Sequence, residues 1–201
     1  TTQAQLPRLP IQERGLDVEH ALCLSASQIE TEANRCFNCG CVAVNSSDMA
    51  VALLALDAKV KIAKRGGLVP IQRFFSPSGN ILDSAGMITE IQVPEPPDHA
   101  RQTFLKFRLR EAIDFPMVSV ASVITLHDGV CKDARIVLGG VAPAPIRATE
   151  AEKVIKGKPL DAVNAEESAE AAVRGALPLG NNAYKVQVAK TLVKRAILSL
   201  L

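Results

Sequence analysis

Residues 46–61 read SSDMAVALLALDAKVK, and this stretch decides much of the fold of the 201-residue chain. Two serines and Asp48 can accept hydrogen bonds from the free N–H groups of a first helical turn, so we expect a helix to begin at about Met49. Between Met49 and Ala58 only Asp57 is polar, which predicts a helix that is buried on nearly all sides. On these residues alone, Asp48 is simply the capping residue of a core helix.

The residues after this helix change to the alternating pattern of a half-exposed strand. Polar and apolar side chains alternate over residues 59–62, and residues 65–67, Arg-Gly-Gly, can turn the chain back into residues 68–71. The pattern predicts a buried helix that leads into a β-hairpin. Residues 74–80 are rich in turn-forming types and are expected to form a surface loop, and residues 87–94 are predicted as a strand that ends at Pro94.

The composition excludes several classes of protein. Hydrophobic residues make up 48% of the chain, which is enough for a substantial core, and no apolar run is long enough to span a bilayer. A net charge of +2, with 3% aromatic residues and no Trp, argues against a nucleic-acid-binding surface. The N-terminal residues lack a signal-peptide pattern, so we expect a cytoplasmic protein. Residues 1–15 are polar and carry no periodic pattern, which suggests a linker from a preceding domain.

Three of the five cysteines are crowded into six residues. Cys36, Cys39 and Cys41 lie together, whereas Cys23 and Cys131 stand apart at spacings that do not complete a four-ligand set. The cluster could ligate iron or zinc, with an iron–sulfur relay as one form of such a site. The alternative is a small-residue turn with idle thiols.

Beyond the proline-rich boundary at residues 94–97, residues 103–110 alternate with period two. Lys106, Arg108 and Arg110 are expected to form a basic row on one face of this strand. Such a row is either a solvated sheet face or a face that binds an anion, such as a phosphate or a reduced cofactor ring.

The remaining residues predict an α+β module. Strands are expected at residues 117–126 and 130–141, with a hairpin turn at residues 127–129, so that three strands form an antiparallel meander. Gly139 and Gly140 indicate a bend or a close backbone approach rather than a phosphate-binding loop. Helices are expected at residues 150–156 with Thr149 as the N-cap, at residues 165–176 with Asn164 as the N-cap, and from about residue 182 to 200. The fold class is therefore α+β: an antiparallel sheet with a buried helix, then a three-stranded sheet packed on three helices.

Three stretches together resemble the flavoprotein (medium) subunit of the molybdenum hydroxylases, the group that contains carbon monoxide dehydrogenase and xanthine dehydrogenase. Residues 47–58 resemble that family's helix after its second flavin loop. Residues 106–114 resemble its Lys-then-Arg-then-Asp strand, and residues 138–143 with the following helices resemble its C-terminal domain. We therefore expect three parts: a linker and short helix from a preceding domain (1–35), a partial FAD-binding subdomain (36–97) and a C-terminal domain of the molybdenum-hydroxylase flavoprotein type (98–201).

The resemblance implies a set of FAD-binding residues. Asp48 would contact the ribityl chain or the flavin edge, and Lys106 would lie near the flavin ring, where a cation favours the anionic reduced form. Gly40 and Asn45 echo the family's second flavin loop, and Arg110 also matches. Arg110 and Asp114 could instead pair with each other and hold the strand. The family's first FAD subdomain, with its glycine-rich loop, has no counterpart in this sequence, so the FAD site would be incomplete.

Residues 32–39 resemble a Glu-Ala-x-Arg-Cys-x-x-Cys segment of NAD(P)H-dependent reductases of the glutamate synthase small-subunit type. This short resemblance implies an upstream NAD(P)H and flavin domain. We therefore expect the chain to be the C-terminal part of an FAD-dependent oxidoreductase that passes electrons between a nicotinamide and another redox centre, alone or as a homo-oligomer. The alternative is a cofactor-free structural or interaction module within a larger redox enzyme.

Overall fold

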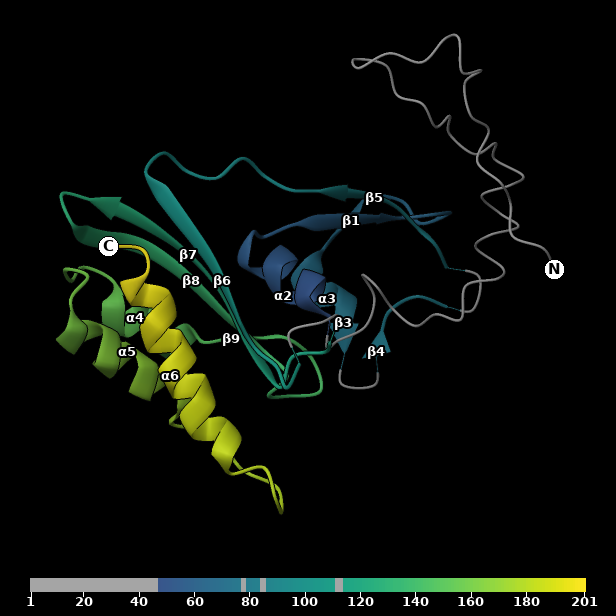
Figure 1. Ribbon diagram of the computed structural model, residues 1–201. Coiled ribbons are helices and arrows are strands. Elements are labelled where there is room, and N and C mark those ends of the chain that lie inside the picture. The colour runs from purple at the N-terminus through teal and green to yellow at the C-terminus, as the bar shows by residue number, and fades with distance from the viewer. Residues whose placement is uncertain (1–46, 77–78, 84–85, 111–113) are drawn as a thin grey trace, which may run out of the picture. The chain divides into compact units, whose positions relative to one another are not determined.

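The computed structural model describes residues 47–76, 79–83, 86–110 and 114–201. It divides the chain into two units, Thr1–Cys39 and Gly40–Leu201, and every described residue belongs to the second unit (Figure 1). In this described part, no helix is long and apolar enough to cross a membrane.

The predicted buried helix is present as α2 (Asp48–Ala55). The Ser47 hydroxyl accepts a hydrogen bond from the Ala50 N–H at 3.3 Å and so caps the first turn. Five of its eight residues are buried, and the exposed side chain is that of Met49, at 50%. The helix ends earlier than expected because Asp57 adopts a left-handed backbone conformation, with φ of 51°.

The predicted hairpin forms the centre of a small antiparallel sheet. Strand β1 (Lys59–Ile62) lies between β2 (Leu68–Pro70) and β5 (Ile88–Gln92). The two strands of the expected hairpin and the strand expected at residues 87–94 are therefore all present. The surface loop expected at residues 74–80 is wrong. That region contains the end of α3 (Ile71–Phe74) and a short hairpin of β3 (Phe75–Ser76) and β4 (Gly79–Asn80). Phe74 is fully buried, and its burial ties this turn-rich segment to the core.

A second antiparallel sheet has four strands in sequential order. They are β6 (Ala100–Phe107), β7 (Val118–His127), β8 (Val130–Gly139) and β9 (Ile146–Arg147). The hairpin between β7 and β8 turns at Asp128 and Gly129, both with positive φ, as the Asp-Gly signal predicted. The fourth strand was not expected, because two residues beside prolines carry no strand pattern. Strand β6 begins earlier than expected and ends at Phe107.

Three C-terminal helices follow: α4 (Thr149–Ile155), α5 (Ala162–Val173) and α6 (Tyr184–Leu198). The start predicted for α5 is wrong by one turn. Asp161, rather than Asn164, is the N-cap, and its carboxylate accepts the Asn164 N–H at 2.8 Å. Likewise Thr149 lies inside α4, which has no side-chain cap.

The four-stranded sheet is covered on both faces. Val118, Val120 and Ile124 of β7 pack with the C-terminal helices, whereas Ala121 and Val123 pack with α2 and the small sheet. This alternation places α4, α5 and α6 on one side of the sheet and α2 on the other (Figure 1). The predicted α+β class is therefore confirmed, with the buried helix α2 forming the second cover of the C-terminal sheet.

Gly139 makes the contact with α2 possible. A Cβ atom at this position would lie 2.4 Å from Cγ2 of Val51 and 2.5 Å from Oγ of Ser119. The close approach expected for the glycine pair is therefore confirmed, because only a residue without a side chain lets the helix lie so near β8.

Candidate functional site

The fold brings together Asp48 and Lys106, which lie 58 residues apart in the sequence. Asp48 is the first residue of α2, and Lys106 lies on β6 opposite Ser119 of β7. Ser119 and Ala121 of β7 lie on the same face of the sheet, and α2 covers this face. Lys106, the partner of Ser119, therefore points toward the N-terminus of α2. Its ammonium group donates a hydrogen bond to Oδ2 of Asp48 at 2.6 Å.

The hydrogen-bonding capacity of this pair is only partly used. Lys106 also donates to the backbone carbonyl of Asp114 at 2.5 Å, so two of its three N–H groups have partners and one remains. The other carboxylate oxygen of Asp48, Oδ1, is buried and accepts no hydrogen bond from any residue that the structure describes. A buried carboxylate oxygen without a donor is unfavourable, so this corner favours a ligand that supplies an O–H or N–H group.

The pairing of Arg110 with Asp114, expected as the alternative to a cofactor contact, is present. The predicted basic row of Lys106, Arg108 and Arg110 is wrong beyond Lys106, because β6 ends at Phe107. Arg110 is 73% exposed and forms an ion pair with Asp114 at 3.4 Å. A hydrogen bond from its guanidinium holds the pKa of the Asp114 carboxyl below its usual value. The pair therefore fixes the chain segment whose Asp114 carbonyl binds Lys106.

A second ionic cluster links the C-terminal end of α2 to the four-stranded sheet. Asp57 accepts a hydrogen bond from Arg135 at 2.5 Å and lies 3.7 Å from Arg147. Arg147 in turn makes a two-pronged pair with Glu152, at 2.9 and 3.1 Å. Burial lowers the pKa of Arg147, but the Glu152 carboxylate and the nearby Asp57 charge outweigh burial and raise it.

Sequence reasoning missed this cluster. Its one available signal was Asp57, the single polar residue of an otherwise apolar run, and no local spacing relates that residue to Arg135 or Arg147. The two ends of α2 thus carry carboxylates that are paired with cations of the C-terminal sheet. This double attachment fixes the position of Asp48 relative to Lys106.

Several predicted site residues lie outside the described part of the chain. These are Gly40 and Asn45 of the expected flavin loop and Cys36, Cys39 and Cys41 of the possible metal cluster. Among the residues that the structure describes, no group of three His, Cys, Asp or Glu side chains could hold a metal ion. Cys131 is fully buried, and its burial raises the pKa of the thiol to about 11.

Two family models together match most of the chain. Residues 17–96 match the FAD binding domain in molybdopterin dehydrogenase, and residues 102–200 match the CO dehydrogenase flavoprotein C-terminal domain. These matches and the fold define the class of the chain as an α+β module of a flavin-dependent oxidoreductase.

Curated relatives and solved structures agree with this class. The chain is 29% identical over 210 residues to a putative xanthine dehydrogenase FAD-binding subunit of Escherichia coli K12, covering 98% of this chain and 70% of that protein. It is 31% identical over 160 residues to the alpha subunit of the 6-hydroxypseudooxynicotine dehydrogenase complex of Paenarthrobacter nicotinovorans, covering 76% of this chain and 54% of the relative. Along nearly its whole length the chain is therefore similar to FAD-binding (medium) subunits of molybdenum hydroxylase-type dehydrogenases.

The structural similarity extends over the greater part of the chain. Quinoline 2-oxidoreductase from Pseudomonas putida 86 superposes with a TM-score of 0.71 and 25% identity, covering 79% of this chain and 57% of that one. A carbon monoxide dehydrogenase from Hydrogenophaga pseudoflava superposes with a TM-score of 0.70 and 26% identity, covering 77% and 56%. The chain thus spans little more than half of each of these solved chains.

Proposed function

We propose that the chain supplies one side of an FAD site in a flavin-dependent oxidoreductase, with Asp48 and Lys106 in contact with the cofactor. The observation that carries this proposal is the 2.6 Å pair that joins the first residue of α2 to the end of β6, the edge strand of the C-terminal sheet. Residues 36–97 would then act as the partial FAD-binding subdomain and residues 98–201 as the C-terminal domain that completes this side of the site.

The polar groups of this corner suit a ligand that carries hydroxyl groups beside an electron-rich ring. Oδ1 of Asp48 can accept a ligand O–H, and the remaining N–H of Lys106 can donate to a ring oxygen or nitrogen. Relief of a buried, unpaired carboxylate oxygen is worth about 1–3 kcal/mol, which would appear as binding affinity. Asp48 would therefore orient the ligand, and Lys106 would place positive charge near the ring.

The charge balance of the pair limits what Lys106 can do. Because Asp48 neutralises much of the Lys106 charge, the pair favours negative charge on a bound ring less strongly than a free lysine would. A ligand hydroxyl bound to Oδ1 would draw negative charge away from Oδ2, the oxygen that pairs with Lys106. Lys106 would then stabilise negative charge on the ring more strongly when the ligand occupies both groups.

The bound flavin would supply the redox chemistry, passing electrons between a nicotinamide and another redox centre. We infer an upstream NAD(P)H and flavin domain as one partner, from the sequence of residues 32–39. Other redox subunits are the second class of partner, supported by the relatives that are named as subunits of dehydrogenases. Gly40, Asn45 and Arg110 would contribute to the same FAD site.

Titration of the purified full chain with FAD tests this proposal. Lys106→Met and Asp48→Asn should each weaken FAD binding by about tenfold, since each removes one charge-assisted hydrogen bond to the ligand. Lys153→Met is the matched control, because Lys153 is an exposed lysine on α4 whose ion-pair partner in the described part of the chain is the neighbouring Glu150. Equal FAD affinity in all four proteins would overturn the assignment of Asp48 and Lys106.

The same titration distinguishes FAD binding from the alternative function, that of a module without a cofactor. A wild-type chain that takes up no FAD, while keeping its fold by circular dichroism, would support a cofactor-free interaction module within a larger redox enzyme.

A further inference from the structure

The C-terminal domain contains a cavity that plays no part in the flavin site. It has a volume of about 380 Å³ and lies between the end of β8, the strand β9 and the helices α5 and α6. This volume falls within the range of about 300–1,000 Å³ that is typical of small-molecule sites. All of its lining residues belong to the described part of the chain.

Two features of the backbone open this cavity. Gly140 adopts a φ of 73°, and a Cβ there would lie 2.7 Å from the Met117 carbonyl oxygen, so the chain must turn sharply out of the sheet after β8. On the other side, α5 ends at Val173 and α6 does not begin until Tyr184. The connection between the two helices forms part of the cavity wall, through residues from Gly175 to Asn182.

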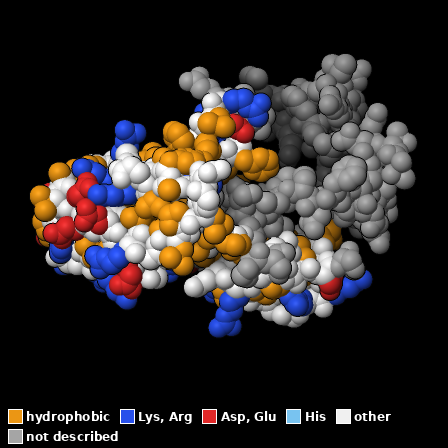
Figure 2. All heavy atoms as spheres, turned by 90° about the horizontal axis from the view of Figure 1, so that it is seen from below, with side chains coloured by type: hydrophobic (Ala, Val, Ile, Leu, Met, Phe, Trp, Pro, Cys, Tyr) orange, Lys and Arg blue, Asp and Glu red, His pale blue; other side chains and the backbone are white. Residues whose placement is uncertain are grey.

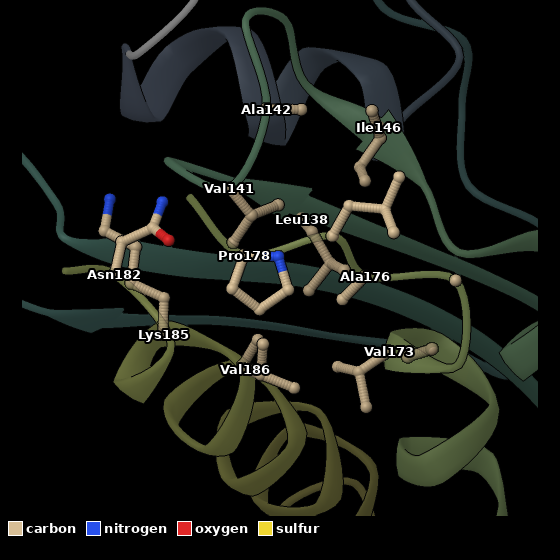
Figure 3. A pocket seen from close by; sticks show the side chains of 14 residues that line it. Leu138, Val141, Ala142, Ile146, Val173, Ala176, Pro178, Asn182, Lys185 and Val186 are labelled. Atoms are coloured by element: carbon tan, nitrogen blue, oxygen red, sulfur yellow. The ribbon is translucent and has the colours of Figure 1, made fainter. Parts of the chain in front are cut away.

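The cavity is apolar along most of its length and polar at one end. Leu138, Val141, Pro178 and Val186 line its middle, and Lys185 and Asn182 lie side by side at one end (Figure 3). A wall of aliphatic side chains that ends in two nitrogen-bearing groups is suited to a ligand with an apolar body and a polar head.

Lys185 differs from the other lysines of α6. Lys190 pairs with Glu166 and Glu170 at 2.7 and 3.0 Å, and Lys194 pairs with Glu166 at 2.7 Å. Lys185 donates to the Gly140 carbonyl at 2.9 Å, and in the described part of the chain no carboxylate lies within ion-pair distance of it. The cavity end therefore holds a cation whose charge no described acidic residue neutralises, with two N–H groups still to donate.

Asn182 adds donors of the same kind. Its side-chain oxygen accepts the Leu179 N–H at 2.6 Å, which fixes the orientation of the amide and turns its two N–H groups away from that contact. Lys185 and Asn182 together present several N–H donors beside one amide oxygen that the Leu179 N–H already occupies in part. Such a pair complements an anionic oxygen group.

We propose that this cavity binds a small monocarboxylic acid with a compact apolar body, its carboxylate held by Lys185 and Asn182. The body would lie against Val141 and Val186 and would cover apolar surface that water now contacts. Leu177 of the α5–α6 connection also lines the cavity and is 90% exposed, which adds apolar surface that such a body could cover. Hydrophobic side chains also gather on the face of the molecule seen from below (Figure 2).

The site uses none of the residues assigned to the flavin. The flavin site lies on the sheet face that α2 covers, whereas the cavity lies on the face that carries the C-terminal helices. The two proposals therefore stand or fall separately.

The test is a titration of the isotope-labelled full chain, followed by amide NMR, with two probes that differ only in the head group. Phenylacetate should shift the amide signals of Ala142, Val173 and Lys185, and its neutral analogue phenylethanol should bind about tenfold more weakly. Lys185→Met should reduce phenylacetate to the affinity of the alcohol and leave the alcohol unchanged. Lys194→Met, a lysine of the same helix outside the cavity, should leave both affinities as in the wild type.

Filling the cavity provides an independent check. Ala176→Trp places a large ring among the lining residues and should abolish the binding of both probes. If this variant melts at a lower temperature than the wild type, its loss of binding does not report on the cavity, and the Lys185→Met result alone tests the proposal. Equal affinity for acid and alcohol in the wild type, an unchanged acid affinity in Lys185→Met, or no shifts among the lining residues up to the solubility limit would overturn the proposal.

Discussion

The contact between α2 and the C-terminal sheet depends on Gly139, so the substitution Gly139→Ala measures how tightly the site is held. The added Cβ would meet Cγ2 of Val51 at 2.4 Å, whereas an ordinary contact begins at 3.4 Å, so α2 would have to move by up to about 1 Å. Gly139 does not have a positive φ, so alanine introduces no backbone strain and the effect reports the contact alone.

Overpacking of this kind costs about 1–3 kcal/mol of unfolding free energy. At about 2–4 °C for each kcal/mol in a chain of this size, the melting temperature should fall by about 2–12 °C. Urea unfolding and calorimetry of the wild type and the variant measure both quantities. FAD affinity should fall as well, because the movement of α2 carries Asp48 away from Lys106.

The matched control is Gly175→Ala, since a Cβ at Gly175 would meet no heavy atom within 4 Å. Its stability should equal that of the wild type or exceed it slightly. Adding Val51→Ala to Gly139→Ala should recover part of the lost stability, because it removes the nearer of the two contacts. A Gly139→Ala protein as stable as the Gly175→Ala protein would refute the close packing of α2 on β8.

Three further predictions follow from single side chains. Asp57→Asn keeps a residue that tolerates positive φ but leaves Arg135 and Arg147 without their shared carboxylate. The unfolding free energy should therefore fall by about 1–2 kcal/mol. An unchanged urea midpoint would contradict this. Two lysines of α6 lower the pKa of Glu166 to about 2, so its contribution to stability is full above the ordinary value of 4.5 and is lost as the pH falls toward about 2. Glu166→Gln should therefore flatten the acid limb of the stability curve, and parallel limbs would exclude the effect. Cys131 is buried and its thiol has a pKa of about 11, so it should resist iodoacetamide in the folded chain and react after denaturation. Peptide mass spectrometry measures the labelling. Rapid labelling of the native protein would argue against the burial of Cys131.

The sequence predicted the elements whose signals are local. The cap and apolar run of α2, the alternation of β1 and the Asp-Gly turn between β7 and β8 each depend on neighbouring residues, and all three are present. Gly139 was also identified, because a glycine pair at a strand end indicates either a bend or a close approach.

What the sequence could not predict depends on contacts between distant segments. Burial of Phe74 turns a loop-like composition into a core element, and β9 forms only because β8 offers it a partner. The Asp57 cluster requires residues from α4, β8 and β9 to meet. The family resemblance indicates Asp48 and Lys106 as site residues, but their direct pairing appears only in the folded chain.

If the Asp48–Lys106 corner holds a flavin, the visible absorption spectrum of the purified full chain should show it. Flavin bands in the wild type, with free FAD in the supernatant after denaturation and a lower flavin content in Lys106→Met, are the predicted result. A colourless chain that also takes up no added FAD would contradict the claim.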